Sequence, residues 1–262
     1  MQKTAVFLLI VAFIIIFPVA KENATEQVSE NIAQKYANEM PREWGEVVTG
    51  VNTRLATEDK FIAFTFDACG TSELSKGYDK ELIQYLIQEN IPATLFISGL
   101  WIDANRDIFR DLAQQPVFEI ENHGLRHRPA SVSGRTAYGL LGTSNTGELI
   151  DEVQGNAKKI ADFTGVQPRY YRSGTNYYDE VAVKITMELG YNVVGYSVLG
   201  DAGATYSREK VRDVLINVSP GSIILLHMNH PESQTAEGVM DAIPILREKG
   251  YRFVKLAEIE LL

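Results

Sequence analysis

The chain has 262 residues, of which 45% are hydrophobic and 23% charged, so it holds enough apolar side chains to bury a full core. This composition excludes a disordered, collagen-like or disulfide-scaffold protein. Acidic residues outnumber basic ones by 34 to 25, and no run of Lys and Arg accompanies an aromatic cluster, so no nucleic-acid partner is expected. The only cysteine, Cys69, cannot form an intramolecular disulfide and stays available for packing or ligation.

The N-terminus is typical of an export signal. Lys3 precedes an uninterrupted apolar run from Ala5 to Phe17, and the small residue Ala20 offers a cleavage point. The run is shorter than the roughly 20 residues needed to span a bilayer. We predict a signal peptide at residues 1–20 or, if it is not cleaved, membrane attachment through residues 4–20. The protein is then exported to the periplasm, the cell envelope or the medium.

Residues 21–59 are polar and rich in Glu and Asn, and they are predicted to form an N-terminal extension to one domain over residues 60–262. In that domain, β-branched and aromatic runs alternate with helical periodicity. Strands are predicted at Phe61–Asp67, Ala93–Ser98, Val117–Glu121, Arg169–Arg172, Tyr191–Ser197, Ser222–His227 and Arg252–Lys255. Helices are predicted at Tyr78–Glu89, Ala104–Gln115, Gly147–Phe163, Asp179–Leu189, Ser207–Val218 and Ala236–Lys249.

Alternating strands and helices predict an α/β fold, a parallel sheet covered by helices. Polar residues decide between a closed barrel and an open sheet. A barrel gathers them at the carboxyl ends of several strands, whereas an open sheet concentrates them at one switch point. Here they follow or end five different predicted strands, which favours a (β/α)7 barrel; they are Asp67, His123, Arg172, Asp201 and His227.

The four histidines fall into two short windows. His123 and His127 lie in ENHGLRHRP, and His227 and His230 lie in ILLHMNHP. A pair at i and i+4 can share one metal if the segment is helical or tightly turned. The glutamate that zinc proteases carry within HExxH or HxxEH is absent, so a metalloprotease would lack its general base.

Two charged residues stand at the ends of apolar strands. Asp67 ends FIAFTF, where a carboxylate serves no packing purpose and is costly to desolvate without a partner. Arg172 stands at another strand end, in YYRSGT. The alternative for these two residues is a buried ion pair that closes the end of the barrel.

Together these windows resemble the NodB-homology polysaccharide deacetylases, carbohydrate esterase family 4, in the family's motif order from about Phe61 to Leu262. TFDACG resembles the TFDDG motif, HGLRH the HxxxH metal motif, YYRSGT the RxPY motif and LLH the closing LxH motif. The resemblance implies a distorted (β/α)7 barrel. It also implies removal of acetyl groups from N-acetylated glycans of chitin, peptidoglycan or an exopolymer, with zinc or another divalent ion as cofactor.

The resemblance further implies a role for each residue. Asp67 is the general base, His227 is the general acid, and Arg172 orients the base, which fits a reaction in which water loses a proton and the leaving amine gains one. The other implied assignments are metal ligands at His123 and His127, an acetyl-pocket residue at Leu225, and an oxyanion-binding backbone N–H near Thr175.

The chain departs from the family pattern at the metal site. Ala68 stands where TFDDG has its second Asp, and alanine cannot bind a metal. The two histidines fall one short of the three protein ligands usual in a catalytic zinc site. Three candidates can fill the gap: Asp67 itself, Cys69 as thiolate, or Asp201 from GYSVLGDAG.

Two other functions remain open at this stage. A catalytically silent carbohydrate-binding protein is one, because Ala68 removes a ligand. A hydrolase of another non-peptide C–N bond, such as a cyclic amide, is the other. Retention of Asp67, Arg172 and His227 favours an enzyme, since a binding groove needs no acid and base pair.

Overall fold

The structure is a computed structural model that describes residues 26–262. The predicted export signal at residues 1–20 therefore lies outside the described residues. The chain divides into two compact units, Met1–Glu39 and Met40–Leu262, and in the first of these residues 26–36 form a helix. None of the helices within residues 26–262 has the length and hydropathy of a membrane-spanning segment.

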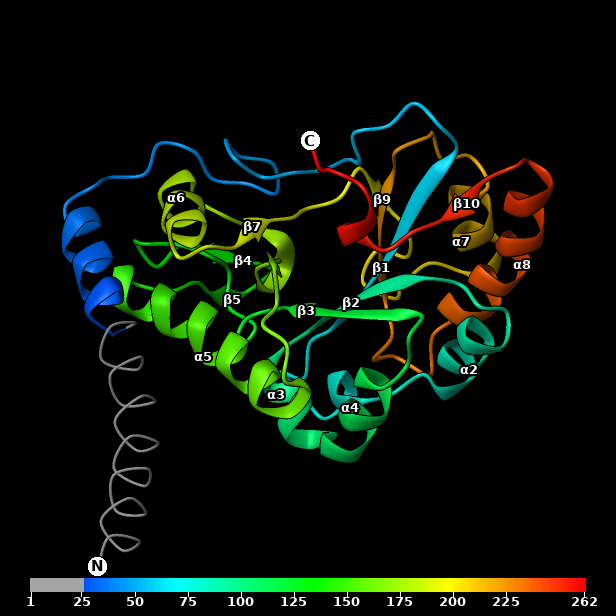
Figure 1. The fold of residues 1–262 in the computed structure, drawn as a ribbon, viewed down its shortest axis with the longest axis horizontal. Coiled ribbons are helices and arrows are strands. Elements are labelled where there is room, and N and C mark those ends of the chain that lie inside the picture. The colour runs from blue at the N-terminus through cyan, green and yellow to red at the C-terminus, as the bar shows by residue number, and fades with distance from the viewer. Residues whose placement is uncertain (1–25) are drawn as a thin grey trace, which may run out of the picture. The chain divides into compact units, whose positions relative to one another are not determined.

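The second unit is built on a curled parallel sheet (Figure 1). The strands run in the spatial order β7-β6-β3-β2-β1-β9-β8, which is the order of a barrel opened between β7 and β8. All the pairs along this path are parallel. The α/β fold and the distorted barrel are thus confirmed. The strands are β1 (Phe61–Ala68), β2 (Ala93–Ile97), β3 (Phe118–Asn122), β6 (Tyr170–Tyr171), β7 (Asn192–Val193), β8 (Val198–Leu199) and β9 (Ile223–His227).

Helices follow the strands and cover the outer face of the sheet (Figure 1). The predicted helix over 104–115 corresponds to α4. The helix before it, α3, was not predicted, and the two are separated at Asn105, which leaves the helical backbone region with φ −131° and ψ 40°. The helices are α2 (Lys80–Gln88), α3 (Gly99–Ala104), α4 (Arg106–Ala113), α5 (Thr146–Thr164), α6 (Glu180–Glu188), α7 (Arg208–Leu215) and α8 (Thr235–Glu248).

The seventh barrel strand is not the one that the sequence predicts. Residues 252–255 were expected to supply it, but β10 (Arg252–Phe253) pairs with the first residues of β1, away from the main path. The seventh strand of the barrel is instead β8, which was not predicted. It is only two residues long and directly follows the run predicted as a single strand over 191–197. A short hairpin of β4 (Thr136–Ala137) and β5 (Leu140–Leu141) was also not predicted.

The alternation of side chains along β1 separates the helix-covered core from the barrel interior. Phe64, Phe66 and Ala68 pack with helix residues in the larger hydrophobic cluster. The other face carries Thr65 and Asp67, both buried. Because successive strand residues point to opposite faces, a polar residue two positions beyond another points to the same side. This alternation places the polar side chains of β1, Thr65 and Asp67, inside the barrel.

Residues 40–59 make backbone bridges within the second unit. Asn52 pairs with Val194, Arg54 with Ser222, and Leu55 with Leu261 near the C-terminus. Leu55 is 1% exposed. This segment therefore runs along the open side of the sheet and contributes to its core before β1 begins.

Candidate metal and acid-base site

A cavity of about 440 Å³ opens at the carboxyl ends of the strands. Asp67 is next to last in β1, His227 ends β9, and the two are register partners on neighbouring parallel strands. Their side chains therefore lie on the same face. Of the residues predicted for the site, the ones that line this cavity are Asp67, His123, His127, Thr175, Leu225 and His227.

Arg172 lies beneath the cavity and holds Asp67. Its Nη1 donates to Asp67 Oδ1 at 2.8 Å and to Thr65 Oγ1 at 2.9 Å, and the guanidinium is fully buried. The guanidinium also lies over the ring of Phe96, 4.2 Å from its centroid. A buried charge needs a counter-charge and satisfied hydrogen bonds, and Asp67 supplies the charge. The buried ion pair expected as one alternative is therefore present, and it fixes the orientation of the Asp67 carboxylate.

Backbone carbonyls complete the support of Arg172. Its Nε donates to Val194 O at 3.2 Å and its Nη2 to Gly195 O at 2.7 Å. Both carbonyls belong to the segment between β7 and β8. The guanidinium fork is therefore fixed on both sides.

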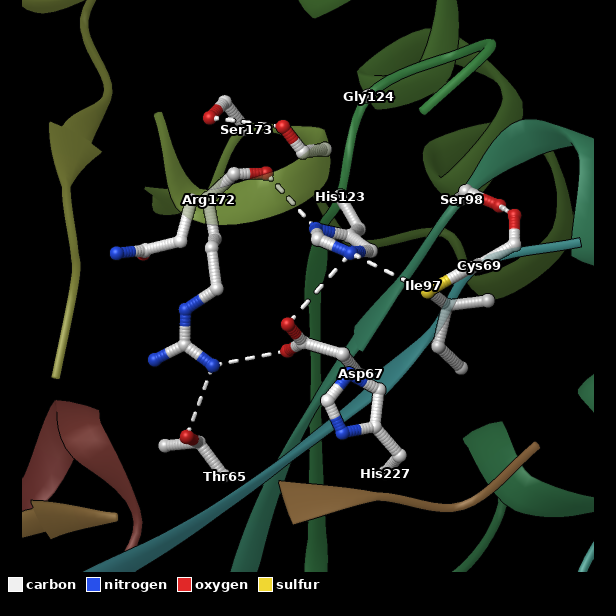
Figure 2. A network of polar contacts seen from close by, with 12 residues as sticks. Thr65, Asp67, Cys69, Ile97, Ser98, His123, Gly124, Arg172, Ser173 and His227 are labelled. Atoms are coloured by element: carbon white, nitrogen blue, oxygen red, sulfur yellow. Dashed lines mark hydrogen bonds and ion pairs between the residues drawn. The ribbon is translucent and has the colours of Figure 1, made fainter. Parts of the chain in front are cut away.

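The imidazole of His123 has a defined orientation (Figure 2). Its Nδ1 lies 3.0 Å from the carbonyl oxygen of Arg172, and since a carbonyl only accepts, Nδ1 carries the proton. Nε2 then presents a lone pair, 3.6 Å from Asp67 Oδ2 and 3.9 Å from Cys69 Sγ. Burial lowers the pKa of His123 and lowers that of His127 well below its usual value. Both rings are therefore neutral near pH 7, as metal ligands must be.

Three buried side chains bring their donor atoms together. Within residues 26–262, the His, Cys, Asp or Glu group able to share a metal ion is Cys69, His123 and His127, whose donor atoms all lie within 4.8 Å of one another. The Nδ1 atom of His127 is buried without a hydrogen-bond partner in the described part of the chain. A sulfur and two imidazoles suit a borderline-soft divalent cation such as zinc. These residues thus fit the expected metal.

Cys69, and not Ala68, brings a donor atom close to the two histidines. Ala68 belongs to the strand and points into the helix-covered core at 0% exposure. Cys69, one residue further, returns to the face of Asp67 and lines the cavity. Burial, and then the charges of Asp67 and Asp201, raise the pKa of the Cys69 thiol well above its usual value. Without a cation the sulfur is protonated, and a bound cation would displace that proton.

His227 is held by Asp201, which excludes Asp201 as a metal ligand in this arrangement. The Nδ1 atom of His227 lies 2.9 Å from Asp201 Oδ1, and its backbone N–H donates to Asp201 Oδ2 at 2.7 Å. Thr235 donates a further hydrogen bond to Oδ2. Burial lowers the pKa of His227, but the Asp201 carboxylate outweighs it, so that the pKa lies above its ordinary value. This imidazole is therefore poised to carry a proton.

Thr175 and Leu225 line the cavity between these groups. Thr175 has a left-handed backbone, with φ 72°, within a short 3-10 turn (Gly174–Asn176), and its buried hydroxyl has no hydrogen-bond partner in the described chain. Leu225, on β9, presents an apolar surface 5% exposed. The cavity lining therefore includes both an apolar side chain from β9 and a turn with strained backbone.

Replacing Gly174 with Ala is expected to disturb the His127 segment. A Cβ at this position would lie 2.2 Å from the carbonyl carbon and oxygen of His127, so one of the two backbone segments must move. We expect the free energy of unfolding to fall by about 3 kcal/mol, and the metal content of the purified protein to fall with it. Gly45→Ala is the control, since a Cβ there meets its nearest atom at 4.0 Å. Equal stability of the two variants in urea unfolding would contradict this packing.

Sequence reasoning missed a carboxylate in the cavity lining. This carboxylate is Glu46, in the segment before β1. Two tyrosines line the cavity as well: Tyr138 in the β4–β5 hairpin and Tyr196 in the segment after β7. No motif marks any of the three, and their contacts span 92 and 150 residues of sequence. Such a cluster cannot be found from local patterns.

The fold is an α/β barrel, and a carboxylate, an imidazole and a cluster of three metal-type donors line one cavity at the carboxyl ends of its strands. The family model of polysaccharide deacetylases matches residues 54–194, more than half of the chain. The chain belongs to the polysaccharide deacetylase family.

Individual relatives agree with this assignment. The chain is 26% identical, over 80% of its length and 92% of the relative, to a peptidoglycan-N-acetylglucosamine deacetylase of Bacillus cereus. Its structure is similar to that of a family 4 carbohydrate esterase from Bacillus anthracis, with a TM-score of 0.64, 26% identity and coverage of 84% and 96%. The fold is also shared with a family 4 pseudoenzyme from Bacillus anthracis, with a TM-score of 0.65, 20% identity and coverage of 81% and 69%.

Proposed function

We propose that this chain is a metal-dependent hydrolase that removes N-acetyl groups from an envelope or extracellular polysaccharide. The observation that carries the proposal is the shared cavity. A carboxylate base, a protonatable imidazole and a three-residue metal-type cluster all line it. Relatives include deacetylases of peptidoglycan and of chitooligosaccharides, which supports an N-acetylated glycan as substrate.

Asp67 is proposed as the general base. Arg172 holds its Oδ1 atom at 2.8 Å, which leaves Oδ2 on the side of His123 and the cavity. A carboxylate in this position can accept the proton of an attacking water. The guanidinium keeps the carboxylate from turning away, so that Arg172 acts as a positioning residue.

His227 is proposed as the general acid. Asp201 binds Nδ1, so the opposite nitrogen, Nε2, is the one free to donate a proton to the amine that leaves the sugar. Because Asp67 and His227 are register partners across β1 and β9, water activation and amine protonation occur within one narrow region. Leu225 is proposed to contact the acetyl methyl, and the backbone N–H near Thr175 to bind the oxyanion.

Cys69, His123 and His127 are proposed to hold the divalent metal, for which zinc is the best match to one sulfur and two nitrogen donors. When bound, the metal polarises the acetyl carbonyl and lowers the pKa of a bound water. The orientation of His123 is fixed from outside by the Arg172 carbonyl, which is the second-sphere contact that metal-binding imidazoles usually have.

Acetate release from a panel of N-acetylated glycans tests the proposal. The panel contains chitin oligomers, peptidoglycan fragments and an N-acetylated exopolysaccharide, each assayed with chelated protein and after addition of zinc, cobalt or nickel. We expect acetate from at least one glycan, lost on chelation and restored by metal. Saturable glycan binding with neither bound metal nor acetate release would instead support a silent carbohydrate-binding protein.

The pH dependence of kcat/KM is expected to report His227. The acid must be protonated, so activity falls as pH rises through its pKa, which the Asp201 carboxylate holds above the ordinary value of about 6.5. In Asp201→Asn the carboxylate is gone, the pKa falls, and the alkaline limb should move to lower pH by about 1–3 units. An alkaline limb at the same pH in both proteins would show that another group is the acid.

Export is proposed from the N-terminal sequence, with residues 1–20 as the signal or, if uncleaved, residues 4–20 as a membrane attachment. An envelope or extracellular substrate agrees with this location. Cell fractionation tests it, and full-length protein confined to the cytosol would contradict it.

A further inference from the structure

A carboxylate without a cationic partner lines the cavity. Glu46 lies outside the residues that the family model matches, yet it shares the cavity with Asp67 and His227. Its two oxygens accept hydrogen bonds from tyrosine hydroxyls, from Tyr138 at 2.9 Å and from Tyr196 at 2.6 Å. In the described part of the chain, no ion pair joins Glu46 to a Lys, Arg or His.

The negative charge of this cluster resides on Glu46. Its hydrogen bond and charge raise the pKa of Tyr138 to about 12. Burial, and then Glu46, raise the pKa of Tyr196 as well. Both phenols therefore remain neutral donors near pH 7. A carboxylate has about four lone-pair positions, of which the tyrosines occupy two, so the others can accept N–H or O–H groups of a ligand.

Aromatic rings adjoin the carboxylate. Tyr138 is 75% exposed, and its ring meets that of Tyr177 edge to face at 5.5 Å. Tyr177 in turn contacts Trp44 at 5.6 Å. Rings that combine an apolar face with a polar edge suit a sugar, whose C–H face packs on the ring while its hydroxyls bond to polar groups. The carboxylate and the rings together have the chemistry of a sugar subsite.

We propose that Glu46, positioned by Tyr138 and Tyr196, binds a sugar unit that carries a free ammonium group and neighbours the unit whose acetamide reacts. This inference rests on the proposed deacetylation. That reaction turns each acetamide into an amine that is protonated near neutral pH, so a unit already processed becomes a favourable neighbour for Glu46. A neighbour that carries a carboxylate is repelled. The favoured substrate class is therefore a partly deacetylated amino-sugar polymer without acidic substituents.

Binding measurements test this subsite without catalysis. The probes are a glucosamine tetramer and an N-acetylglucosamine tetramer, titrated calorimetrically into metal-loaded wild type, Glu46→Gln and Glu58→Gln. Gln keeps one acceptor oxygen for a tyrosine, and the hydroxyl that met the other oxygen can rotate to accept from the amide N–H, so the charge is removed with little change of shape. We expect Glu46→Gln to weaken the glucosamine tetramer about five-fold, the effect of one partly exposed charge contact, and to leave the N-acetylated tetramer nearly unchanged.

Glu58→Gln is the charge-matched control, because Glu58 is exposed and does not line the cavity. It should bind both tetramers as wild type does. Equal weakening of both tetramers by Glu46→Gln would overturn the proposal, as would the same selective loss in Glu58→Gln. In Glu46→Gln, the kcat/KM for partly deacetylated oligomers divided by the kcat/KM for carboxylated oligomers should also fall. If no glycan releases acetate, deacetylation is refuted, while the two tetramers still decide whether Glu46 selects ammonium groups.

Discussion

Replacing Asp67 with Asn is expected to reduce kcat by a factor of about 10²–10⁴, the usual contribution of a general base. The amide keeps the shape and one acceptor oxygen for Arg172, but it cannot take the proton of water. The metal content should stay at the wild-type level, because Asp67 is not among the three clustered donors. Acetate release and metal analysis on the same preparation measure both.

The same substitution leaves the fully buried Arg172 without a counter-charge, so the protein is also expected to be less stable. Breaking a buried pair in this way costs about 3 kcal/mol or more. Asp103→Asn serves as a control, because Asp103 pairs with Lys159 at the surface and does not line the cavity. Loss of metal from Asp67→Asn would identify Asp67 as a ligand and require another base. Full activity in Asp67→Asn would refute its role.

Removing the imidazoles of His123 and His127 together is expected to abolish metal binding and activity. Two of the three clustered donors are lost, and one sulfur cannot retain a divalent ion against water. Metal content by elemental analysis and acetate release should both fall to background. His230→Ala is the matched control, because this half-buried histidine bonds to Glu232 and lies outside the cavity lining. Metal retained by the double variant would move the metal site elsewhere.

The sequence predicts most of the barrel because its signals are local. The helix predicted over 147–163 is present as α5, and its apolar stripe of Leu149, Val153, Ala157 and Ile160 recurs at helical spacing and is buried. Gly190 and Gly250, which directly follow the predicted helices over 179–189 and 236–249, have positive φ values of 97° and 83°, and a glycine in this conformation commonly ends a helix. The split between β7 and β8 was missed because strands of two residues leave no alternation to detect.

The predicted set of metal ligands depended on which of two adjacent residues, Ala68 or Cys69, faces the barrel interior. Aligning TFDACG with the shorter motif TFDDG puts Ala68 in the place of a metal ligand, which leaves the predicted site one donor short. The structure extends β1 through Ala68, so Ala68 points to the helices and Cys69 points to the histidines. A shift of one residue exchanges the two faces of a strand, and only the observed strand end resolves it.

The Asp201 contact could not be predicted from spacing. As a carboxylate near a strand end it was an equal candidate for metal ligation, but its oxygens accept from His227 and Thr235. Whether this carboxylate binds His227 or a metal depends on the three-dimensional position of Asp201, which the spacing of residues in the sequence does not give. Glu46 was missed for the same reason, since its partners are distant in sequence.

The absorption spectrum of the cobalt(II)-loaded protein tests the central claim, that Cys69 completes a working metal site. One equivalent of cobalt is added to chelated wild type and to Cys69→Ser, and the spectrum is recorded with the rate of acetate release. A sulfur-to-cobalt charge-transfer band in the near ultraviolet, present in active wild type and absent from Cys69→Ser, is the predicted result. An active cobalt protein without that band, or with an unchanged spectrum in Cys69→Ser, would contradict the account.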